Sequence, residues 1–327
     1  MCFVRSPVNK TPVIFLSGPT ASGKTDIAVD LVRRLPLEII SVDSTLVYRG
    51  LDVGTGKPKP DILAMAPHRL VDIRDPAQAY SAAEFVKDAR TAIREIEKNS
   101  RIPLLVGGTG LYFRALRYGL SPLPAANPAV RKQLTEQAEK WGWSMLHQRL
   151  AQVDPLAAAR IHPNDPQRIQ RALEVYELTN SPMTTLLARR SENTLDYPII
   201  QLVLEPTDRS ALRERIAARF HEMLAHGLVV EVGRLRARGD LHDDLPSMRA
   251  VGYRQVWSHL SGRVSYPDMV AAAIATTRQL AKRQLTWLRS EIDATRFSCQ
   301  DVTVLDKILF YLSKNSLLKG NTGVTTS

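Results

Sequence analysis

The chain contains few of the features that mark secreted or membrane proteins. Only two of its 327 residues are cysteine, Cys2 and Cys299, which is too few for a disulfide framework or a zinc site. No apolar run approaches the ~18 residues needed to cross a bilayer, and the N-terminus lacks the apolar stretch of a secretory signal. We therefore expect a protein of the reducing cytoplasm, without a membrane partner. Nothing in the sequence requires more than a monomer.

Basic residues outnumber acidic ones. The 44 Lys and Arg against 33 Asp and Glu leave a formal net charge of +11. Such an excess favours a polyanionic partner, although it is also compatible with diffuse, solvated charge. The basic residues are spread along the chain rather than gathered in one tail, so folding would have to assemble any nucleic-acid surface.

Short apolar runs alternate with amphipathic segments in the first part of the chain. The runs predict strands over residues 13–17, 38–42, 69–73, 102–106 and 199–204, each continuously apolar, as in strands buried on both faces. Between them lie helical patterns such as residues 82–98, which Ser81 and Glu84 open with a capping box. This order predicts an α/β fold whose parallel sheet is flanked by helices.

The alternation is interrupted once. Residues 121–196 show helical periodicity and no strand run, with Asn127-Pro128 and Asp165-Pro166 as helix starts. We therefore expect a first core part (1–120), a helical insertion (121–196), a returning strand with C-terminal helices (197–297) and a flexible tail (298–327). Within the C-terminal part, one long helix is predicted over about residues 266–290.

A phosphate-binding loop follows the first predicted strand. It fits the pattern GxxxxGK[ST] and consists of Gly18, Pro19, Thr20, Ala21, Ser22, Gly23, Lys24 and Thr25. Its backbone N–H groups and the start of the next helix would face phosphate oxygens. Lys24 would reach the outer phosphate, and the Thr25 hydroxyl would hold Mg²⁺.

The usual companions of this loop in nucleotide hydrolases are incomplete. The nearest counterpart of a second magnesium-binding strand, Leu70-Val71-Asp72, has only two apolar residues before its carboxylate, and no Asn-Lys-x-Asp segment is present to read guanine. The loop therefore predicts a bound diphosphate or triphosphate without identifying the compound.

A carboxylate ends the second predicted strand. Asp43 follows an apolar run, and the carboxyl ends of strands face the ligand crevice in sheets of this kind. An ionised Asp there could accept a proton or bind Mg²⁺. It could equally cap the following turn, and position alone does not separate these interpretations.

Several motifs occur together in a characteristic order, at residues 18–25, 41–44, 48–55, 67–70, 80–82, 107–112, 160–165, 249–254 and 278–289. This set resembles the bacterial tRNA isopentenyltransferase (dimethylallyltransferase) family over about residues 11–290. The resemblance implies a P-loop core with an inserted all-helical tRNA-binding domain. It also implies transfer of a dimethylallyl group from dimethylallyl diphosphate to the N6 amine of adenosine 37, in tRNAs that read codons beginning with U.

The resemblance also implies roles for individual residues. Asp43 would accept the proton of the attacking amine, and Thr109 would lie beside the reacting groups. Arg219 would bind the diphosphate together with the phosphate loop and Mg²⁺. Arg215, one helical turn away, remains better explained as part of a solvated basic face.

Contacts to the tRNA anticodon stem-loop are implied for four separated segments and two single positions. The residues are Asp43, Ser44, Thr45, Leu46, Thr109, Arg131, Gln167, Arg168, Ile169, Gln170, Arg171, Arg249, Ala250, Val251, Gly252, Tyr253, Arg254, Lys282, Arg283 and Arg289. Among them, Tyr253 offers a ring for stacking on RNA. By contrast, we assign Tyr112, Trp257 and Trp287 to the core.

Two other functions remain compatible with the phosphate loop. One is a small-molecule kinase or nucleotide hydrolase, and the other is an RNA-binding protein in which the loop is regulatory. Transfer of label from dimethylallyl diphosphate to tRNA would distinguish a dimethylallyltransferase from both of these alternatives.

Overall fold

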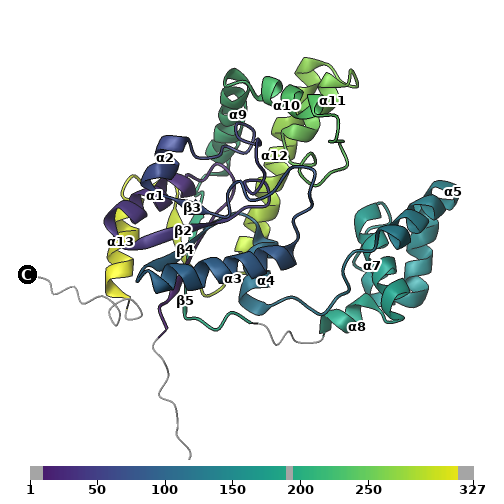
Figure 1. Ribbon diagram of the computed structural model, residues 1–327, viewed down its shortest axis with the longest axis horizontal. Coiled ribbons are helices and arrows are strands. Elements are labelled where there is room, and N and C mark those ends of the chain that lie inside the picture. The colour runs from purple at the N-terminus through teal and green to yellow at the C-terminus, as the bar shows by residue number, and fades with distance from the viewer. Residues whose placement is uncertain (1–9, 189–193, 316–327) are drawn as a thin grey trace, which may run out of the picture. The chain divides into compact units, whose positions relative to one another are not determined.

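A parallel β-sheet forms the centre of the larger of two compact units. The computed structural model describes residues 10–188 and 194–315, and within them six strands pair in the order β3-β2-β4-β1-β5-β6 (Figure 1). The strands are β1 (Val13–Ser17), β2 (Leu37–Val42), β3 (His68–Arg69), β4 (Ile102–Gly107), β5 (Ile199–Glu205) and β6 (Thr295–Ser298). All pairings are parallel, which confirms the predicted α/β class.

The register of the central strands determines where the functional loops begin. Ser17 on β1 and Val42 on β2 both lie beside Gly107 on β4. These strands are buried along their whole length, as their continuous apolar runs predict. The segments that follow β1, β2 and β4 therefore leave the sheet side by side, at the carboxyl ends of these strands.

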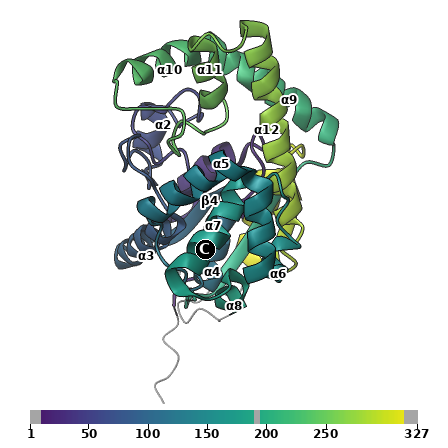
Figure 2. The same cartoon turned by 90° about the vertical axis from the view of Figure 1, so that its right-hand side faces the viewer.

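The same unit also contains helices. They are α1 (Lys24–Arg34), α2 (Pro60–Met65), α3 (Ala82–Lys98), α4 (Gly110–Tyr118), α9 (Arg209–Ala225), α10 (Leu228–Ala237), α11 (Tyr253–Leu260), α12 (Tyr266–Leu288) and α13 (Val304–Lys314). Of these, α1, α3 and α13 pack against the strands. The predicted capping box is present at α3, where Ser81 Oγ accepts a hydrogen bond from the Glu84 N–H. Figure 2 shows α9, α10, α11 and α12 gathered beyond the sheet, and α9 packs on α12.

The second unit, Leu116–Leu195, is helical in its described residues. It contains α5 (Pro128–Val153), α6 (Pro155–Ala158), α7 (Pro166–Thr179) and α8 (Met183–Ala188). Asn127 and Asp165 accept backbone N–H groups at the starts of α5 and α7, as predicted. Gly142 interrupts α5 with a φ of 81°, a conformation that glycine adopts without a steric penalty.

The structure corrects two expectations about the sheet and the tail. The run 69–73 enters the sheet only through its first residue, because Leu70 and Asp72 have positive φ angles and turn the chain away. The predicted flexible tail instead contains the end of β6 and all of α13, whose Val304, Ile308 and Leu312 are buried in the core around the sheet. Residues 316–327 lie outside the described part of the chain.

No helix in the described ranges is both long and apolar enough to cross a bilayer.

The packing of α13 generates the first prediction. Ile308 is fully buried, whereas Phe310 on the same helix is 65% exposed. We expect Ile308→Ala to lower the free energy of unfolding in urea by about 3 kcal/mol, because the truncation leaves a cavity. Phe310→Ala is the matched control and should have little effect. Equal effects of the two substitutions would show that α13 does not pack as described.

Candidate active site

The phosphate loop lies between β1 and α1. Lys24 begins α1 and its Nζ donates a hydrogen bond to the Pro19 carbonyl at 3.1 Å. The Thr20 N–H donates to Gln284 Oε1 at 2.8 Å, and Gln284 Nε2 donates to the Gly108 carbonyl at 3.0 Å. Gln284 on α12 therefore ties the phosphate loop to the turn after β4.

A pocket of about 160 Å³ opens beside this loop. Of the residues predicted for the site, those that line it are Thr20, Ala21, Lys24, Thr25, Asp43, Thr45, Leu46, Arg219, Ala250, Val251, Gly252 and Tyr253. Segments that follow β1 and β2 thus meet parts of α9 and the approach to α11. Thr109 is not among the lining residues, but its N–H donates to the Val42 carbonyl at 3.4 Å, directly before Asp43.

The pocket has an excess of buried positive charge. Burial lowers the pKa of Lys24 to about 8, although the attraction of Asp43 opposes the shift and the repulsion of Arg219 adds to it. Burial also lowers the pKa of Arg219, and the attraction of Asp43, Asp26 and Glu222 opposes the change. Lys24 and Arg219 thus repel each other at one pocket where both are desolvated, an arrangement that favours an anionic ligand.

Asp43 adopts the geometry of a turn cap and still faces the pocket. Its Oδ1 accepts hydrogen bonds from the Thr45 N–H at 2.8 Å, the Thr45 hydroxyl at 2.6 Å and the Leu46 N–H at 3.3 Å. Oδ2 has no hydrogen-bond partner among the described residues. Asp43 can therefore cap the turn and also accept a proton, because the two roles use different oxygens of the same carboxylate.

The two arginines one turn apart on α9 have different surroundings. Arg219 Nη2 donates to the Thr55 carbonyl at 3.2 Å, and its Nη1 donates to Thr20 Oγ1 at 3.4 Å. Arg215 does not line the pocket; its Nη2 donates to the sulfur of Cys299 at 3.0 Å. The structure thus corrects the view of Arg215 as simply solvated, since part of its guanidinium is buried.

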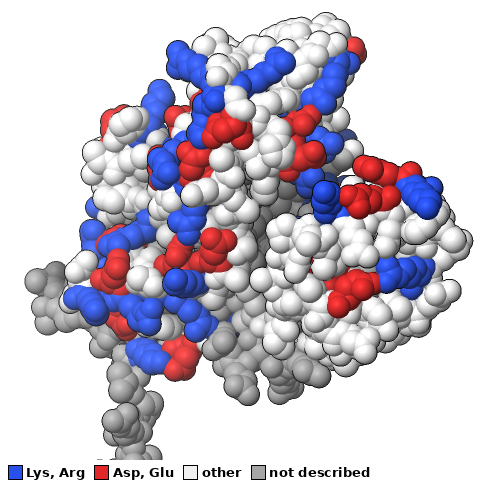
Figure 3. All heavy atoms as spheres, turned by 45° about the vertical axis from the view of Figure 1, so that its right-hand side comes forward, with Lys and Arg blue, Asp and Glu red and all other residues white. Residues whose placement is uncertain are grey.

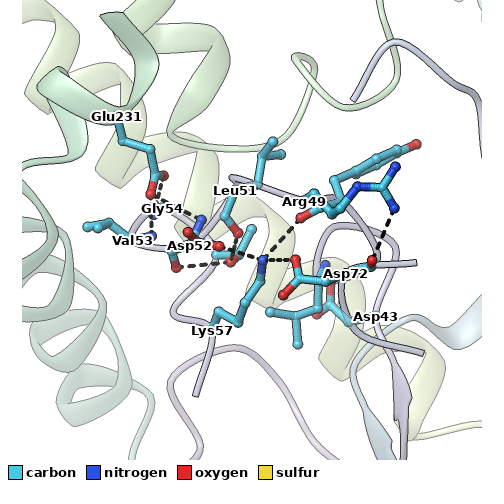
Figure 4. A network of polar contacts seen from close by, with 12 residues as sticks. Asp43, Arg49, Leu51, Asp52, Val53, Gly54, Lys57, Asp72 and Glu231 are labelled. Atoms are coloured by element: carbon cyan, nitrogen blue, oxygen red, sulfur yellow. Dashed lines mark hydrogen bonds and ion pairs between the residues drawn. The ribbon is translucent and has the colours of Figure 1, made fainter. Parts of the chain in front are cut away.

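Three structurally important residues escaped the sequence reasoning: Lys57, Glu231 and Gln284. Glu231 accepts hydrogen bonds from a loop after β2, and Lys57 contacts both Asp52 and Asp72 (Figure 4). Asp72 thus pairs with Lys57, and it does not line the pocket beside the phosphate loop. Only Gln284 had a sequence signal, since it lies within the motif 278–289.

Comparisons with known proteins agree with this arrangement. A family model described as IPP transferase matches residues 46–291. A tRNA dimethylallyltransferase from Thioalkalivibrio sulfidiphilus (strain HL-EbGR7) is 62% identical over 279 residues, which cover 85% of this chain and 87% of the relative. The chain belongs to the IPP transferase family.

Solved structures support the same family and fold. A full-length tRNA isopentenylpyrophosphate transferase from Bacillus halodurans is 35% identical, with a TM-score of 0.70 over 95% of this chain and 98% of that one. A tRNA delta(2)-isopentenylpyrophosphate transferase from Staphylococcus epidermidis is 32% identical, with a TM-score of 0.67 over 94% and 100%. A eukaryotic dimethylallyltransferase acting on tRNA, 23% identical with a TM-score of 0.77 over 97% and 82%, shares the fold.

In this IPP transferase family member, two of the arginines predicted to contact RNA are held by a buried carboxylate. Glu174, with no exposed side-chain surface, accepts hydrogen bonds from Arg131 Nε at 2.9 Å and Arg171 Nη1 at 2.7 Å. The Asn127 N–H also donates to it at 2.7 Å. Burial raises the pKa of Glu174, but these hydrogen bonds outweigh burial and leave the pKa below its usual value.

The other predicted RNA contacts divide by exposure. Exposed side chains belong to Gln167, Arg168, Arg249, Arg254, Lys282, Arg283 and Arg289. On the face in Figure 3, basic and acidic side chains are interspersed. Two expectations are corrected: Ile169 is fully buried in the helical unit, and the ring of Tyr253 has no exposed surface on which a base could stack. As predicted, Tyr112 and Trp257 are buried, and Trp287 packs near Phe113.

The environment of Glu174 generates a pH-dependent prediction. We expect Glu174→Gln to destabilise the protein at pH 7 by about 2 kcal/mol, because it weakens charge-assisted hydrogen bonds. The folded-state pKa lies below the usual 4.5, so this stabilisation is present above the unfolded-state pKa. It is lost as the pH falls through the folded-state value, and urea unfolding curves of variant and wild type should converge in strong acid.

Glu139→Gln is the control for this measurement, because Glu139 is an exposed carboxylate on α5. It should have little effect on unfolding, as followed by far-UV circular dichroism. A Glu174→Gln effect that persists undiminished in acid would contradict the assignment.

Proposed function

We propose that this family member is a tRNA dimethylallyltransferase. It transfers the dimethylallyl group of dimethylallyl diphosphate to the exocyclic N6 amine of adenosine 37, in tRNAs that read codons beginning with U. The observation that carries the proposal is the buried pocket in which Lys24 and Arg219 share the single carboxylate of Asp43. The 62% identical relative, named as a tRNA dimethylallyltransferase, supports this choice of substrate.

The pocket walls suit both ends of the proposed donor. Lys24, Arg219 and the N–H groups of the phosphate loop would bind the diphosphate. Apolar side chains that also line the pocket, including Ile216, Phe220 and Met223 of α9, would surround the five-carbon group. As the allylic carbon–oxygen bond breaks, negative charge grows on the diphosphate, and the two cations stabilise it.

Asp43 is suited to receive the proton. The N6 amine is a weak nucleophile because its lone pair is delocalised into the adenine ring. As the bond from N6 to the allylic carbon forms, the amine must lose a proton, which Asp43 Oδ2 would accept. The turn-cap hydrogen bonds to Oδ1 fix the orientation of the carboxylate for this transfer.

We also propose Mg²⁺ as a cofactor in this pocket. The hydroxyls of Thr25 and Ser41 line the pocket with Asp43, and Ser41 Oγ is buried without a hydrogen-bond partner among the described residues. Hydroxyl oxygens fit Mg²⁺, which retains water and binds phosphate oxygens rather than requiring a full protein cage, so Asp43 Oδ2 stays available for the proton. When bound, Mg²⁺ would neutralise charge on the leaving diphosphate.

The proposed RNA partner is the tRNA anticodon stem-loop. The exposed basic side chains at 168, 249, 254, 282, 283 and 289 support it, together with Arg131 and Arg171 of the helical unit. Since the target base is stacked in the loop, it must rotate into the pocket before it reacts. We further propose that the protein acts as a monomer in the cytoplasm, where unmodified tRNA is available.

The decisive experiment for the function is label transfer. Radiolabelled dimethylallyl diphosphate should transfer its label to unmodified tRNA with release of diphosphate. If the label stays on the donor while ATP is hydrolysed, the kinase or hydrolase alternative is favoured instead.

Asp43→Asn separates the two roles of this residue. The amide oxygen still accepts the turn-cap hydrogen bonds but the side chain no longer accepts a proton. We expect turnover to fall by about 10²- to 10⁴-fold in a protein that still folds and still binds tRNA. Near-normal turnover would leave Asp43 with the capping role alone.

The basic surface on α12 predicts a salt-dependent affinity. Binding of tRNA should weaken steeply with added salt, because neutralised phosphates release counterions. The double variant Lys282→Ala/Arg283→Ala should reduce the slope of log affinity against log salt by up to about 2. Lys98→Ala, an exposed cation on α3, is the control and should leave the slope unchanged. Identical slopes for all three proteins would argue against an RNA contact at this part of α12.

A further inference from the structure

One carboxylate organises the loop that follows β2. Glu231, on α10, accepts hydrogen bonds through Oε2 from the N–H groups of Asp52 at 3.1 Å and Val53 at 2.7 Å. Its Oε1 accepts from the Gly54 N–H at 3.2 Å and from the Tyr253 hydroxyl at 2.5 Å. Three successive backbone N–H groups thus converge on one ionised group, which is a strong arrangement for fixing a loop (Figure 4).

The loop is also closed on itself. The Thr55 hydroxyl donates to the Leu51 carbonyl at 2.6 Å, and the Gly56 N–H donates to the Val53 carbonyl at 3.0 Å. Lys57 Nζ donates to the Tyr48 carbonyl at 3.1 Å and to Asp52 Oδ1 at 2.5 Å. The Lys57 side chain is only 6% exposed, so the loop is anchored at both ends.

This loop contacts the guanidinium of Arg219. The Thr55 carbonyl accepts from Arg219 Nη2, and Gly56 lies against the same group. A Cβ at Gly56 would be 2.1 Å from Arg219 Nη2, and the φ of +64° also favours glycine there. The loop therefore leaves little freedom for the guanidinium on this side.

Arg219 depends on such neutral acceptors. Among the described residues it forms no ion pair with a carboxylate within 4.0 Å. Its hydrogen-bond partners among the described residues are the Thr55 carbonyl and the Thr20 hydroxyl, so a displaced loop would remove one of the two groups that orient it. Gly54, Thr55 and Gly56 also line the pocket with it.

From these contacts we infer that Glu231 is a positioning residue for the diphosphate site. It acts through residues 52–55, which present the Thr55 carbonyl to Arg219, and Tyr253 orients the Glu231 carboxylate. The inference rests on the proposed function, because it takes the ligand of Arg219 to be a diphosphate.

The test is a double-mutant cycle with Glu231→Gln and Arg219→Ala. In Glu231→Gln, one carboxylate oxygen becomes an N–H donor facing backbone N–H groups, so the loop should shift. We expect the dissociation constant of inorganic diphosphate, measured by calorimetry, to rise about tenfold. The KM for dimethylallyl diphosphate should rise with it, while the KM for tRNA stays unchanged.

In the Arg219→Ala background the same substitution should have almost no further effect, since the group through which it acts is gone. An equal loss in both backgrounds, or no loss in the wild-type background, would overturn the inference. Glu214→Gln, an exposed carboxylate on α9, is the charge-matched control and should bind diphosphate normally.

Two further results keep the outcomes distinct. If Glu231→Gln does not fold, Tyr253→Phe decides the question: it removes one donor to Oε1 and must still weaken diphosphate binding, by about twofold to threefold. Wild-type affinity in Tyr253→Phe would then overturn the inference. If the wild-type protein itself neither binds diphosphate nor transfers the dimethylallyl group, the proposed function fails rather than the role of Glu231.

Discussion

Two positive charges held close together in one pocket are the constraint on which the site depends. Lys24 and Arg219 are far apart in the sequence but line the same pocket and repel each other, while Asp43 attracts both and Asp26 and Glu222 also attract Arg219. The parallel sheet makes this arrangement possible, since the loops after β1, β2 and β4 leave at one edge. An anionic ligand would complete the charge balance, and Asp43 would remain available for the proton.

The protein orients the arginines that we expect to bind RNA or the anionic ligand in two physically different ways. In the helical unit, the buried carboxylate of Glu174 pairs directly with Arg131 and Arg171, so their charges are compensated before any RNA arrives. In the larger unit, Arg219 is oriented by a carbonyl and a hydroxyl, which fix its direction and leave its charge for the ligand. A carboxylate is still involved there, but Glu231 acts on backbone N–H groups of the loop rather than on the arginine itself.

The predicted RNA contacts differ in the exposure of their side chains. Residue type and motif order identified the segments, but the face of each helix decided which side chains are accessible. Arg168 is exposed on α7, whereas Ile169 next to it belongs to the core of the helical unit. An aromatic ring in a basic segment also suggests stacking, but the Tyr253 ring is buried and its hydroxyl donates a hydrogen bond to Glu231.

The sequence by itself determined the features that depend on near neighbours along the chain. These are the phosphate loop, the capping box of α3, the apolar strands and the helical character of the insertion, because short-range spacing and backbone preferences encode them. Only the tertiary structure decided the rest. The addition of β6 to the edge of the sheet, the packing of α13 on the core and the hydrogen bonds from Glu231 to residues 52–54 join distant segments. Glu231 lies 179 positions from Asp52, and no local pattern records a contact that forms only when the chain folds back on itself.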